Sequence, residues 1–187
     1  LTSFCFFICS KIGYIYIVHL KNRCEGLCTF AVGHLALGYL TGKATSKLLN
    51  VNLNIPLLFV ASIIPDIDLL IPGLEHRGIT HSIIFLSLLS LPTFFLFRKR
   101  ATPYFVAVIQ HSILGDFLTS GGKGIQLLWP ATLEWYGVGI GIASLTGILI
   151  EGTFFLASIS IMLKTKDAWV LFQHHPSNIL LSIPIFT

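Results

Sequence analysis

Residues 64–82, IPDIDLLIPGLEHRGITHS, bring two aspartates, two histidines and an arginine together in a sequence that otherwise avoids charge. Carboxylate oxygens and imidazole nitrogens bind divalent metals, and mixed His and Asp sets suit zinc, manganese or iron better than calcium or magnesium. A bound cation would also offset the charge of the carboxylates, which are costly in an apolar environment. The stretch therefore predicts one wall of a metal site.

Further ionisable residues occur in or beside the other apolar segments. A charge inside a membrane span costs ~2.5–3.5 kcal/mol on insertion scales, so such residues usually face a partner or a cavity. The candidate site residues are His34, Asp66, Asp68, His76, Arg77, His81, His111, Asp116 and Glu151. Each one taken singly has a plain structural explanation, such as a capping aspartate or a packing histidine. Only their combination favours a metal site.

Local sequence signals predict the backbone conformation of residues 64–82, which form the first wall of the site. Pro65 lacks an amide hydrogen and disfavours a helical residue before it, so we expect a helix break there. In an extended turn Asp66 and Asp68 would point to one side, whereas in a regular helix they would diverge by about 200 degrees. Thr80 can cap the following helix, which would place His81 in its first turn.

The elements that carry these residues are predicted to be membrane helices. The chain has 187 residues, is 54% hydrophobic and 11% charged, and has a mean hydropathy of +0.83, which separates it from ordinary soluble domains. Candidate spans are residues 4–20, 27–40, 55–72, 79–97, 103–119 and 137–163. Several are shorter than the ~20 residues that cross a bilayer unaided. We expect an all-α polytopic membrane helix bundle of about five to seven helices.

The domain organisation predicted from this pattern is simple. Residues 1–27 would form an N-terminal apolar extension or a first span, and residues 28–187 a single membrane-embedded helical domain with the metal site. The net charge of +4 is spread along helix ends without a basic stripe, so we expect no nucleic-acid partner.

Basic clusters predict the orientation. The cluster at residues 98–100 follows the fourth span and marks its cytoplasmic end by the positive-inside rule. Alternating the spans puts the lysines before the third span and after the last one on the same side, whereas Lys21 and Arg23 oppose this scheme. The candidate ligands then face the extracytoplasmic side of the cytoplasmic membrane.

Several short motifs lie between residues 30 and 151. They are Gly33-His34, Pro65-Asp66-Ile67-Asp68, His76-Arg77-Gly78-Ile79-Thr80-His81-Ser82, the segment from His111 to Asp116 with Leu118-Thr119, Gln126-Leu127-Leu128-Trp129-Pro130, and Thr146-Gly147 with Glu151. On these motifs the chain resembles the predicted membrane-bound metal-dependent hydrolases, a family that includes a LexA-regulated inner-membrane protein. That family is distantly similar to zinc-dependent phospholipase C and P1-type nucleases.

The resemblance implies a His/Asp metal centre, with zinc expected first and manganese or iron as alternatives. The metal ligands it implies are His34, Asp66, His81, His111 and Asp116, with Asp68 and His76 as further ligands or as partners of ligands. For catalysis it implies that Asp68 or Glu151 accepts a proton and that Arg77 binds a phosphate or carboxylate.

One spacing departs from the family pattern. The family usually has three residues between a histidine and an aspartate that lie one helical turn apart, whereas four residues separate His111 from Asp116. In a regular helix these two side chains would diverge by about 140 degrees. A π-bulge near Gly115 would realign them, and without it one of the two would not bind the metal.

Three classes of function stay open. The favoured one is a metal-dependent hydrolase that cleaves a phosphoester or lipid-linked ester with a metal-activated water, on a lipid or amphiphilic substrate. The alternative is a transporter or ion-handling protein, which would distribute ionisable residues through the membrane depth. A structural protein would use polar groups to specify helix packing. The one-sided distribution of the candidates favours the hydrolase over the transporter.

Overall fold

The computed structural model describes residues 17–119, 123–141 and 144–171, so most of the predicted span at residues 4–20 lies outside the described part. Its α-helices are α2 (Ile17–Leu49), α3 (Ile55–Ile63), α4 (Ile83–Phe97), α5 (Thr102–Gln110), α6 (Phe117–Thr119) and α7 (Leu145–Thr165). Short 3-10 helices are η1 (Ile64–Leu70), η2 (Ile79–His81), η3 (Arg98–Ala101) and η5 (Asp167–Leu171), and η4 (His111–Asp116) is a π-helix. The described residues form no strand, only an isolated bridge between Ile125 and Tyr136, and the predicted all-α helix bundle is confirmed.

Helix α2 joins elements that the sequence separates. The predicted spans at residues 4–20 and 27–40 imply a break near residues 21–26, but α2 runs without interruption from Ile17 to Leu49. The polar residues of this stretch include no proline, so nothing in the backbone stops the helix. The boundary between the two candidate spans therefore lies inside one helix, because polarity alone does not end a helix.

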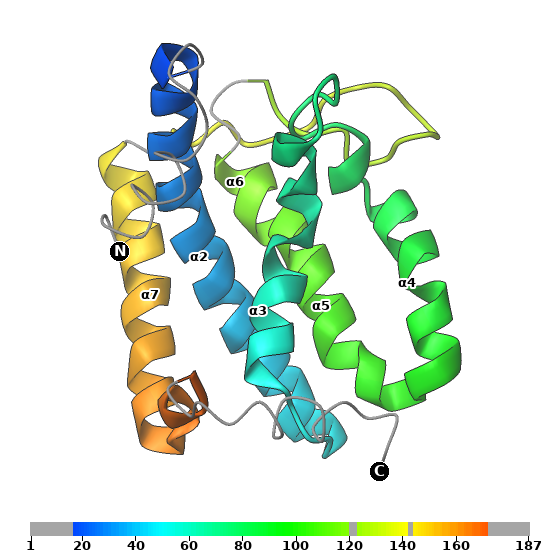
Figure 1. The fold of residues 1–187 in the computed structure, drawn as a ribbon, viewed down its shortest axis with the longest axis vertical. Helices are drawn as coiled ribbons and strands as arrows, with labels where there is room; N and C mark the ends of the chain where they lie inside the picture. The colour runs from blue at the N-terminus through cyan, green and yellow to red at the C-terminus, as the bar shows by residue number, and fades with distance from the viewer. Residues whose placement is uncertain (1–16, 120–122, 142–143, 172–187) are drawn as a thin grey trace.

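Helix α2 also forms the centre of the bundle (Figure 1). It packs against α3, α5 and α7, and α5 packs in turn against α3 and α4. The buried hydrophobic core consists of Tyr39, Ile55, Leu58, Ala61, Leu86, Ala107 and Val108. Glycines bring α2 close to α3, because a Cβ atom at Gly38 would lie 1.8 Å from Ser62 Oγ. The interface between α2 and α3 therefore depends on the missing side chain.

Replacing Gly38 by alanine should destabilise the bundle by about 1–3 kcal/mol, the usual cost of overpacking. Ser62 cannot easily move aside, since it is fully buried and its hydroxyl donates to the Leu58 carbonyl at 2.8 Å. Thermal unfolding in detergent measures the effect. Gly152→Ala is the matched control, because nothing lies within 4 Å of a Cβ atom at that position. Equal losses in both variants would contradict the close contact at Gly38.

The start of α4 differs from the prediction. Ser82, not Thr80, is the N-cap, and its hydroxyl accepts a hydrogen bond from Phe85 N at 3.3 Å. His81 consequently lies in the 3-10 turn before the helix rather than in its first turn. Thr80 is free to donate its hydroxyl to Asp68 Oδ2 at 2.8 Å. The sequence has two hydroxyl residues here, and the 3-10 turn η2, which contains Thr80, leaves Ser82 as the cap of α4.

Helix α7 begins later than predicted. The expected span at residues 137–163 starts with a loop at residues 137–141, where Gly139 has a φ of 78°, and the helix itself begins at Leu145. With 21 residues, α7 is the one helix in the described ranges that is long and apolar enough by itself to cross a membrane. The shorter predicted spans correspond to helices that are interrupted or flanked by 3-10 and π segments.

Basic residues and the ionisable cluster occupy opposite ends of the bundle (Figure 1). Helices α2, α4 and α7 all finish at the lower end of the view, where Lys47, η3 and Lys164 lie in or after their last turns. The turns η1 and η2 lie at the upper end. This is the separation that the predicted orientation requires, although the side of the membrane stays a prediction.

A polar cluster ties the lower ends of α2 and α7 together. Asp167 Oδ2 accepts hydrogen bonds from Tyr39 OH at 2.7 Å and Thr165 Oγ1 at 2.8 Å, and Lys43 Nζ lies 2.6 Å away. Burial alone would raise the pKa of Asp167, but these three contacts outweigh it and hold the pKa below its usual range. The ionised form is therefore favoured by folding.

Replacing Asp167 by asparagine should lower the unfolding temperature near neutral pH. Because the folded-state pKa lies below the unfolded value, the stabilisation is complete above the unfolded pKa and is lost as the pH falls through the folded pKa. The difference between Asp167→Asn and the original protein should thus shrink in acid. Thermal scans in detergent across that range measure it. A difference that stays constant down to the lowest pH would show that the carboxylate charge is not responsible.

Candidate metal centre

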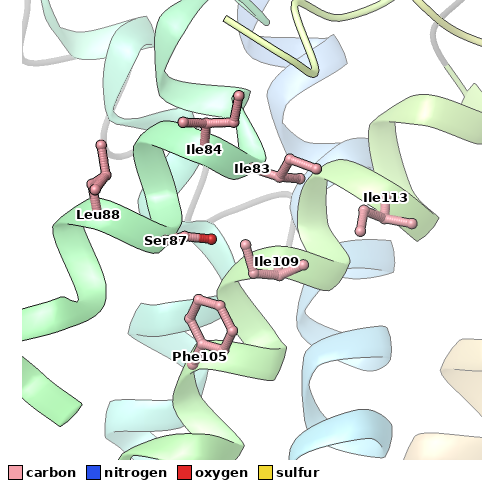
Figure 2. Close-up of a pocket in the computed structure, with 7 residues that line it drawn as sticks. All are labelled: Ile83, Ile84, Ser87, Leu88, Phe105, Ile109 and Ile113. Atoms are coloured by element: carbon pink, nitrogen blue, oxygen red, sulfur yellow. The ribbon is translucent and has the colours of Figure 1, made fainter. Parts of the chain in front are cut away.

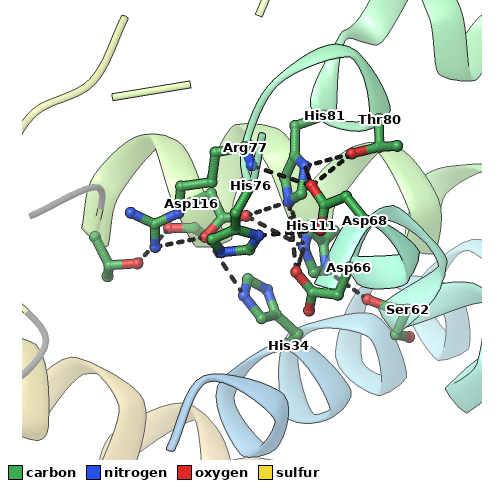
Figure 3. A network of polar contacts seen from close by, with 12 residues as sticks. His34, Ser62, Asp66, Asp68, His76, Arg77, Thr80, His81, His111 and Asp116 are labelled. Atoms are coloured by element: carbon green, nitrogen blue, oxygen red, sulfur yellow. Dashed lines mark hydrogen bonds and ion pairs between the residues drawn. The ribbon is translucent and has the colours of Figure 1, made fainter. Parts of the chain in front are cut away.

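Four side chains from three separate elements converge (Figure 3): Asp66 from η1, His81 from η2, and His111 and Asp116 from η4. The two Nε2 atoms of His81 and His111 are 3.3 Å apart. Asp66 Oδ1 lies 3.5 Å and 3.3 Å from these nitrogens, and Asp116 Oδ2 lies 2.9 Å and 3.2 Å from them. Ligands bound tetrahedrally at ~2.0–2.2 Å are roughly 3.3–3.6 Å apart, so the spacing fits one metal ion.

The cluster is enclosed except beside Asp66. The side chains of His81, His111 and Asp116 are at most 1% exposed, whereas that of Asp66 is 12% exposed. Two carboxylates in such an environment need compensating charge or hydrogen bonds. A divalent cation would supply compensating charge, and Asp66 is the member of the cluster nearest to the surface.

Hydrogen bonds orient both imidazoles with Nε2 toward the centre. His111 Nδ1 lies 2.7 Å from the Ser62 carbonyl oxygen, which can only accept, so Nδ1 carries the proton. His81 Nδ1 lies 3.1 Å from Thr80 Oγ1, whose own hydrogen points to Asp68, so His81 Nδ1 is also the donor. In the neutral rings both Nε2 lone pairs then face the same point, as metal-binding histidines require.

Asp68 lies behind His81 rather than among the four converging atoms. Its carboxylate accepts hydrogen bonds from Arg77 N at 3.1 Å and Thr80 Oγ1 at 2.8 Å, and His76 Nδ1 lies 3.1 Å from Oδ1. The Asp68 side chain is fully buried, while that of His76 is 34% exposed. Asp68, His76 and His81 Nδ1 form a second group with metal-ligand spacing. His81 cannot serve both groups as a neutral ring, because only one of its nitrogens has a lone pair.

Arg77 and His34 lie against the other oxygen of Asp116. Arg77 NH2 is 2.9 Å from Asp116 Oδ1, and His34 Nε2 is 3.7 Å from the same atom. The His34 ring also stacks on His111, with centroids 3.7 Å apart. These contacts leave Asp116 Oδ2 directed at the two Nε2 atoms. The structure thus gives Arg77 and His34 contacts that position Asp116 and His111.

Residues 126–129 form hydrogen bonds with the segment that carries Arg77 and His81. Arg77 has a φ of 66°, which is unusual for a residue with a side chain, and its carbonyl accepts from Gln126 N at 2.9 Å. Ile83 N donates to Leu127 O at 3.0 Å, and Ser82 Oγ donates to Trp129 O at 2.5 Å. A left-handed residue held in place near a buried cluster is the kind of backbone strain found at functional sites.

A π-helix sets the opposite wall. Residues His111–Asp116 form η4, and each π turn adds one residue to the α-helical repeat. The bulge that the sequence analysis gave as one of two outcomes is therefore present, and it brings His111 Nε2 to 3.2 Å from Asp116 Oδ2. The close packing here includes His34, since a Cβ atom at Gly115 would lie 2.2 Å from His34 Cε1.

Glu151 lies on the far side of His34. It lines a small cavity of about 20 Å³ with Gly33, His34, Leu114 and Phe154, between α2, η4 and α7. The four converging ligand atoms do not include it. The sequence analysis predicted Glu151 to lie at the site, whereas in the structure Glu151 lies beyond the His34 ring.

Comparison with known proteins shows the family to which this chain belongs. Residues 30–185 match the family described as YdjM inner membrane protein. The chain belongs to this family. The inner membrane protein YbcI of Escherichia coli (strain K12) is 38% identical over 63 residues, which is 29% of this chain and 36% of that protein. No solved structure matches the chain.

Membership in the YdjM family supports the membrane association predicted from hydropathy. The matched range begins just before His34 and includes all nine candidate site residues. These relatives are described only as inner membrane proteins, so hydrolase activity, zinc, and the distant similarity to phospholipase C and P1-type nucleases stay predictions.

The sequence analysis named Thr80 as a helix cap and residues 126–130 as a motif, but it assigned neither a role in positioning the site, and it did not name Ser62. In the structure the Ser62 carbonyl, the Thr80 hydroxyl and residues 126–129 all hold site residues in place. The motif around Thr80 carried a usable signal, because a hydroxyl one residue before a ligand histidine can contact its Nδ1. Nothing in the sequence marks a backbone carbonyl as the partner of His111.

Proposed function

We propose that this YdjM-family protein is a multi-pass enzyme of the cytoplasmic membrane that hydrolyses a phosphoester or lipid-linked ester with one divalent metal ion, zinc first among the candidates. The convergence of four ligand atoms carries the proposal: the two Nε2 atoms lie 3.3 Å apart, and each lies 2.9–3.5 Å from a carboxylate oxygen of Asp66 and of Asp116. The Nδ1 hydrogen bonds aim both imidazoles at the same point. When bound, such an ion lowers the pKa of a water molecule and polarises the bond to be cleaved.

The exposed edge at Asp66 is the expected place of reaction. Four protein ligands complete a tetrahedral zinc site, so hydrolysis requires a fifth position or the displacement of one ligand. His81, His111 and Asp116 are sealed, and Asp66 alone among the four retains appreciable exposure. Water and the scissile group would therefore approach beside Asp66.

The pair formed by His76 and Asp68 is suited to move the proton. His76 is half-buried at the edge of the site, with Nδ1 hydrogen-bonded to the buried Asp68 carboxylate. A carboxylate hydrogen-bonded to a histidine orients the ring, an arrangement used in general acid–base catalysis. Asp68 then acts through His76 and His81, and Arg77 acts by holding Asp116.

The membrane arrangement follows from the two ends of the bundle. The basic ends of α2, α4 and α7 would face the cytoplasm, and the metal centre would face the extracytoplasmic side. Residues 102–119 form a continuous run of α5, η4 and α6, and α2 is 33 residues long, so both are long enough to accompany α7 through much of a bilayer.

A structural metal site is the second candidate, because four protein ligands are typical of closed zinc sites that only stabilise a fold. The alternative of an ion-handling protein has less support from the geometry. The buried His and Asp side chains of the described residues gather around two adjoining groups that share His81 instead of forming a path along the bundle.

Metal analysis combined with activity assays tests the proposal. The full chain, purified in detergent after growth with added zinc, manganese or iron, should contain about one metal ion per chain. It should cleave bis(p-nitrophenyl) phosphate or phosphatidylglycerol in mixed micelles. His76→Ala should retain the metal and lose most of the activity. A chain that never holds metal would refute the proposal, whereas metal with a chelation-sensitive unfolding temperature but no cleavage would establish the structural site instead.

A further inference from the structure

Glu151 carries a carboxylate that the proposed mechanism does not use. It lies about 9 Å into α7 at helical rise, in the helix that is long and apolar enough to cross a membrane. A carboxylate in such a helix is costly, so it normally faces a partner or a cavity that holds water. Among the residues that the structure describes, Glu151 has no hydrogen-bond or ion-pair partner. Its surroundings must therefore compensate the carboxylate in another way.

The Glu151 carboxylate lies against α2, next to His34. Helices α2 and α7 pack together, and a Cβ atom at Gly33 would lie 3.3 Å from both Cδ and Oε1 of Glu151. The missing side chain of Gly33 leaves room for the carboxylate at the position immediately before His34. The His34 ring in turn contacts two proposed ligands, because Nε2 lies 3.7 Å from Asp116 Oδ1 and the ring stacks on His111.

Glu151 and His34 line the same cavity, which has a volume of about 20 Å³. A buried water molecule needs roughly 10–15 Å³ and two to four polar partners. The lining offers the Glu151 carboxylate, the His34 ring and the Thr119 hydroxyl. That hydroxyl donates to the Gly115 carbonyl at 2.9 Å and still has lone pairs that can accept. The cavity therefore has the size and the chemistry for one water molecule.

A larger groove on the bundle does not meet the same requirement. The groove between α4 and α5 has a volume of about 440 Å³, and Ser87 is the one polar side chain in its lining (Figure 2). Such walls offer a water molecule too few hydrogen-bond partners to hold it in one place. Polar lining, not volume, thus singles out the small cavity beside Glu151 as a water site.

We propose that this cavity holds one water molecule that joins Glu151 to His34, and that Glu151 thereby acts as a positioning residue of the metal centre. The water and the carboxylate fix the orientation in which the His34 ring contacts Asp116 and His111. This role differs from the proton acceptor that the resemblance implies, because Glu151 is not among the four converging ligands. The positioning role rests on the proposed function, whereas the water site does not.

Radiolytic labelling tests the water site directly. The full chain is reconstituted in vesicles of phosphatidylethanolamine and phosphatidylglycerol, equilibrated with isotopically labelled water and exposed to an X-ray pulse. Hydroxyl radicals formed from an internal water oxidise the side chains beside it, and mass spectrometry maps them. Leu37 lines the cavity and is 8% exposed, whereas Val108 is also 8% exposed but does not line it. We expect several-fold more oxidation at Leu37, and equal oxidation would overturn the water site.

Two substitutions of Glu151 separate a water bridge from packing. Glu151→Gln keeps the length and the hydrogen bonding of the side chain, whereas Glu151→Met keeps a similar length without it. Oxidation of Leu37 should persist in Glu151→Gln and fall to the level of Val108 in Glu151→Met. Thr153→Val removes a hydroxyl from an exposed position of α7 and should change nothing. Undiminished oxidation of Leu37 in Glu151→Met would show that Glu151 does not hold the water.

The metal centre reports the positioning role. Altering an outer partner of a metal ligand costs ~10–100-fold in affinity, so zinc should bind about 10-fold more weakly to Glu151→Met and almost normally to Glu151→Gln. The visible absorption of the cobalt-loaded protein, which depends on ligand geometry, should shift in Glu151→Met alone. Unfolding temperatures of the metal-free variants check folding. Unchanged affinity and spectrum in Glu151→Met, or equal losses in both variants, would overturn the positioning role.

The proposed function and the water site fail separately. A chain that binds no metal would refute the proposed function and the positioning role with it, while oxidation of Leu37 would still decide the water site. Stoichiometric metal without excess oxidation of Leu37 would do the reverse: the metal centre would stand and the water bridge would not.

Discussion

Replacing His81 by alanine should remove metal from the purified protein, and the loss of affinity should exceed the ~10–100-fold that follows from altering a partner of a metal ligand. The His81 Nε2 atom lies 2.9–3.5 Å from the other three ligand atoms. Its removal leaves two carboxylates and one imidazole, and it also opens a space in a buried region. Elemental analysis after metal-replete expression, and titration of the metal-free protein, measure the change.

The Thr80→Val variant is compared with His81→Ala, because it should weaken metal binding less. It keeps the volume near that of threonine but removes the hydroxyl that contacts His81 Nδ1 and donates to Asp68. The ring can then rotate or exchange tautomer, so metal affinity should fall by about 10–100-fold without being abolished. Circular dichroism should show unchanged helix content for both variants. Equal effects of the two substitutions, or metal retained in His81→Ala, would contradict the assignment of His81 as a ligand.

The ligand types could be predicted because they conflict with their surroundings. Asp66 and Asp116 stand out in a chain so poor in charge, and a metal site explains both these carboxylates and the imidazoles near them. The end of α3 near Pro65 could be predicted for an equally local reason, since α3 ends at Ile63. The extended turn was wrong, because Ile64 stays helical and the chain continues as the 3-10 helix η1 through Asp66 and Asp68. The ligand residue types and the backbone effect of proline each depend on a short stretch of sequence, so both could be predicted.

The roles within the site could not be predicted in the same way, because they depend on distances between segments. Asp66 and Asp68 are two residues apart and look equivalent in the sequence. In the structure Asp66 Oδ1 faces both Nε2 atoms, whereas Asp68 contacts Nδ1 of His81 and the backbone of Arg77. Which carboxylate meets which ring nitrogen is decided by how η1 and η2 pack, and no local signal encodes that packing.

Deleting Leu114 should leave the metal centre intact, even though it removes a residue between two proposed ligands. The π-helix η4 accommodates one residue more than an α-helix would, so the deletion should convert it to α-helix and keep the following segment in place. His111 and the aspartate would then be four positions apart, about 40 degrees around the helix, and still on one face. Leu114 is 42% exposed, so its loss costs little packing. Metal content of the purified protein should stay close to that of the original chain.

Inserting an alanine after Leu114 is the opposite change and should abolish metal binding. Six positions would then separate His111 from the aspartate, and an α-helix would place them about 240 degrees apart. A second residue cannot be absorbed without a further bulge, and Gly115 already lies too close to His34 to admit a Cβ atom. Loss of metal in the deletion but not in the insertion would show that η4 does not set the geometry. The opposite result would establish the one-residue bulge as the reason why His111 and Asp116 can act together.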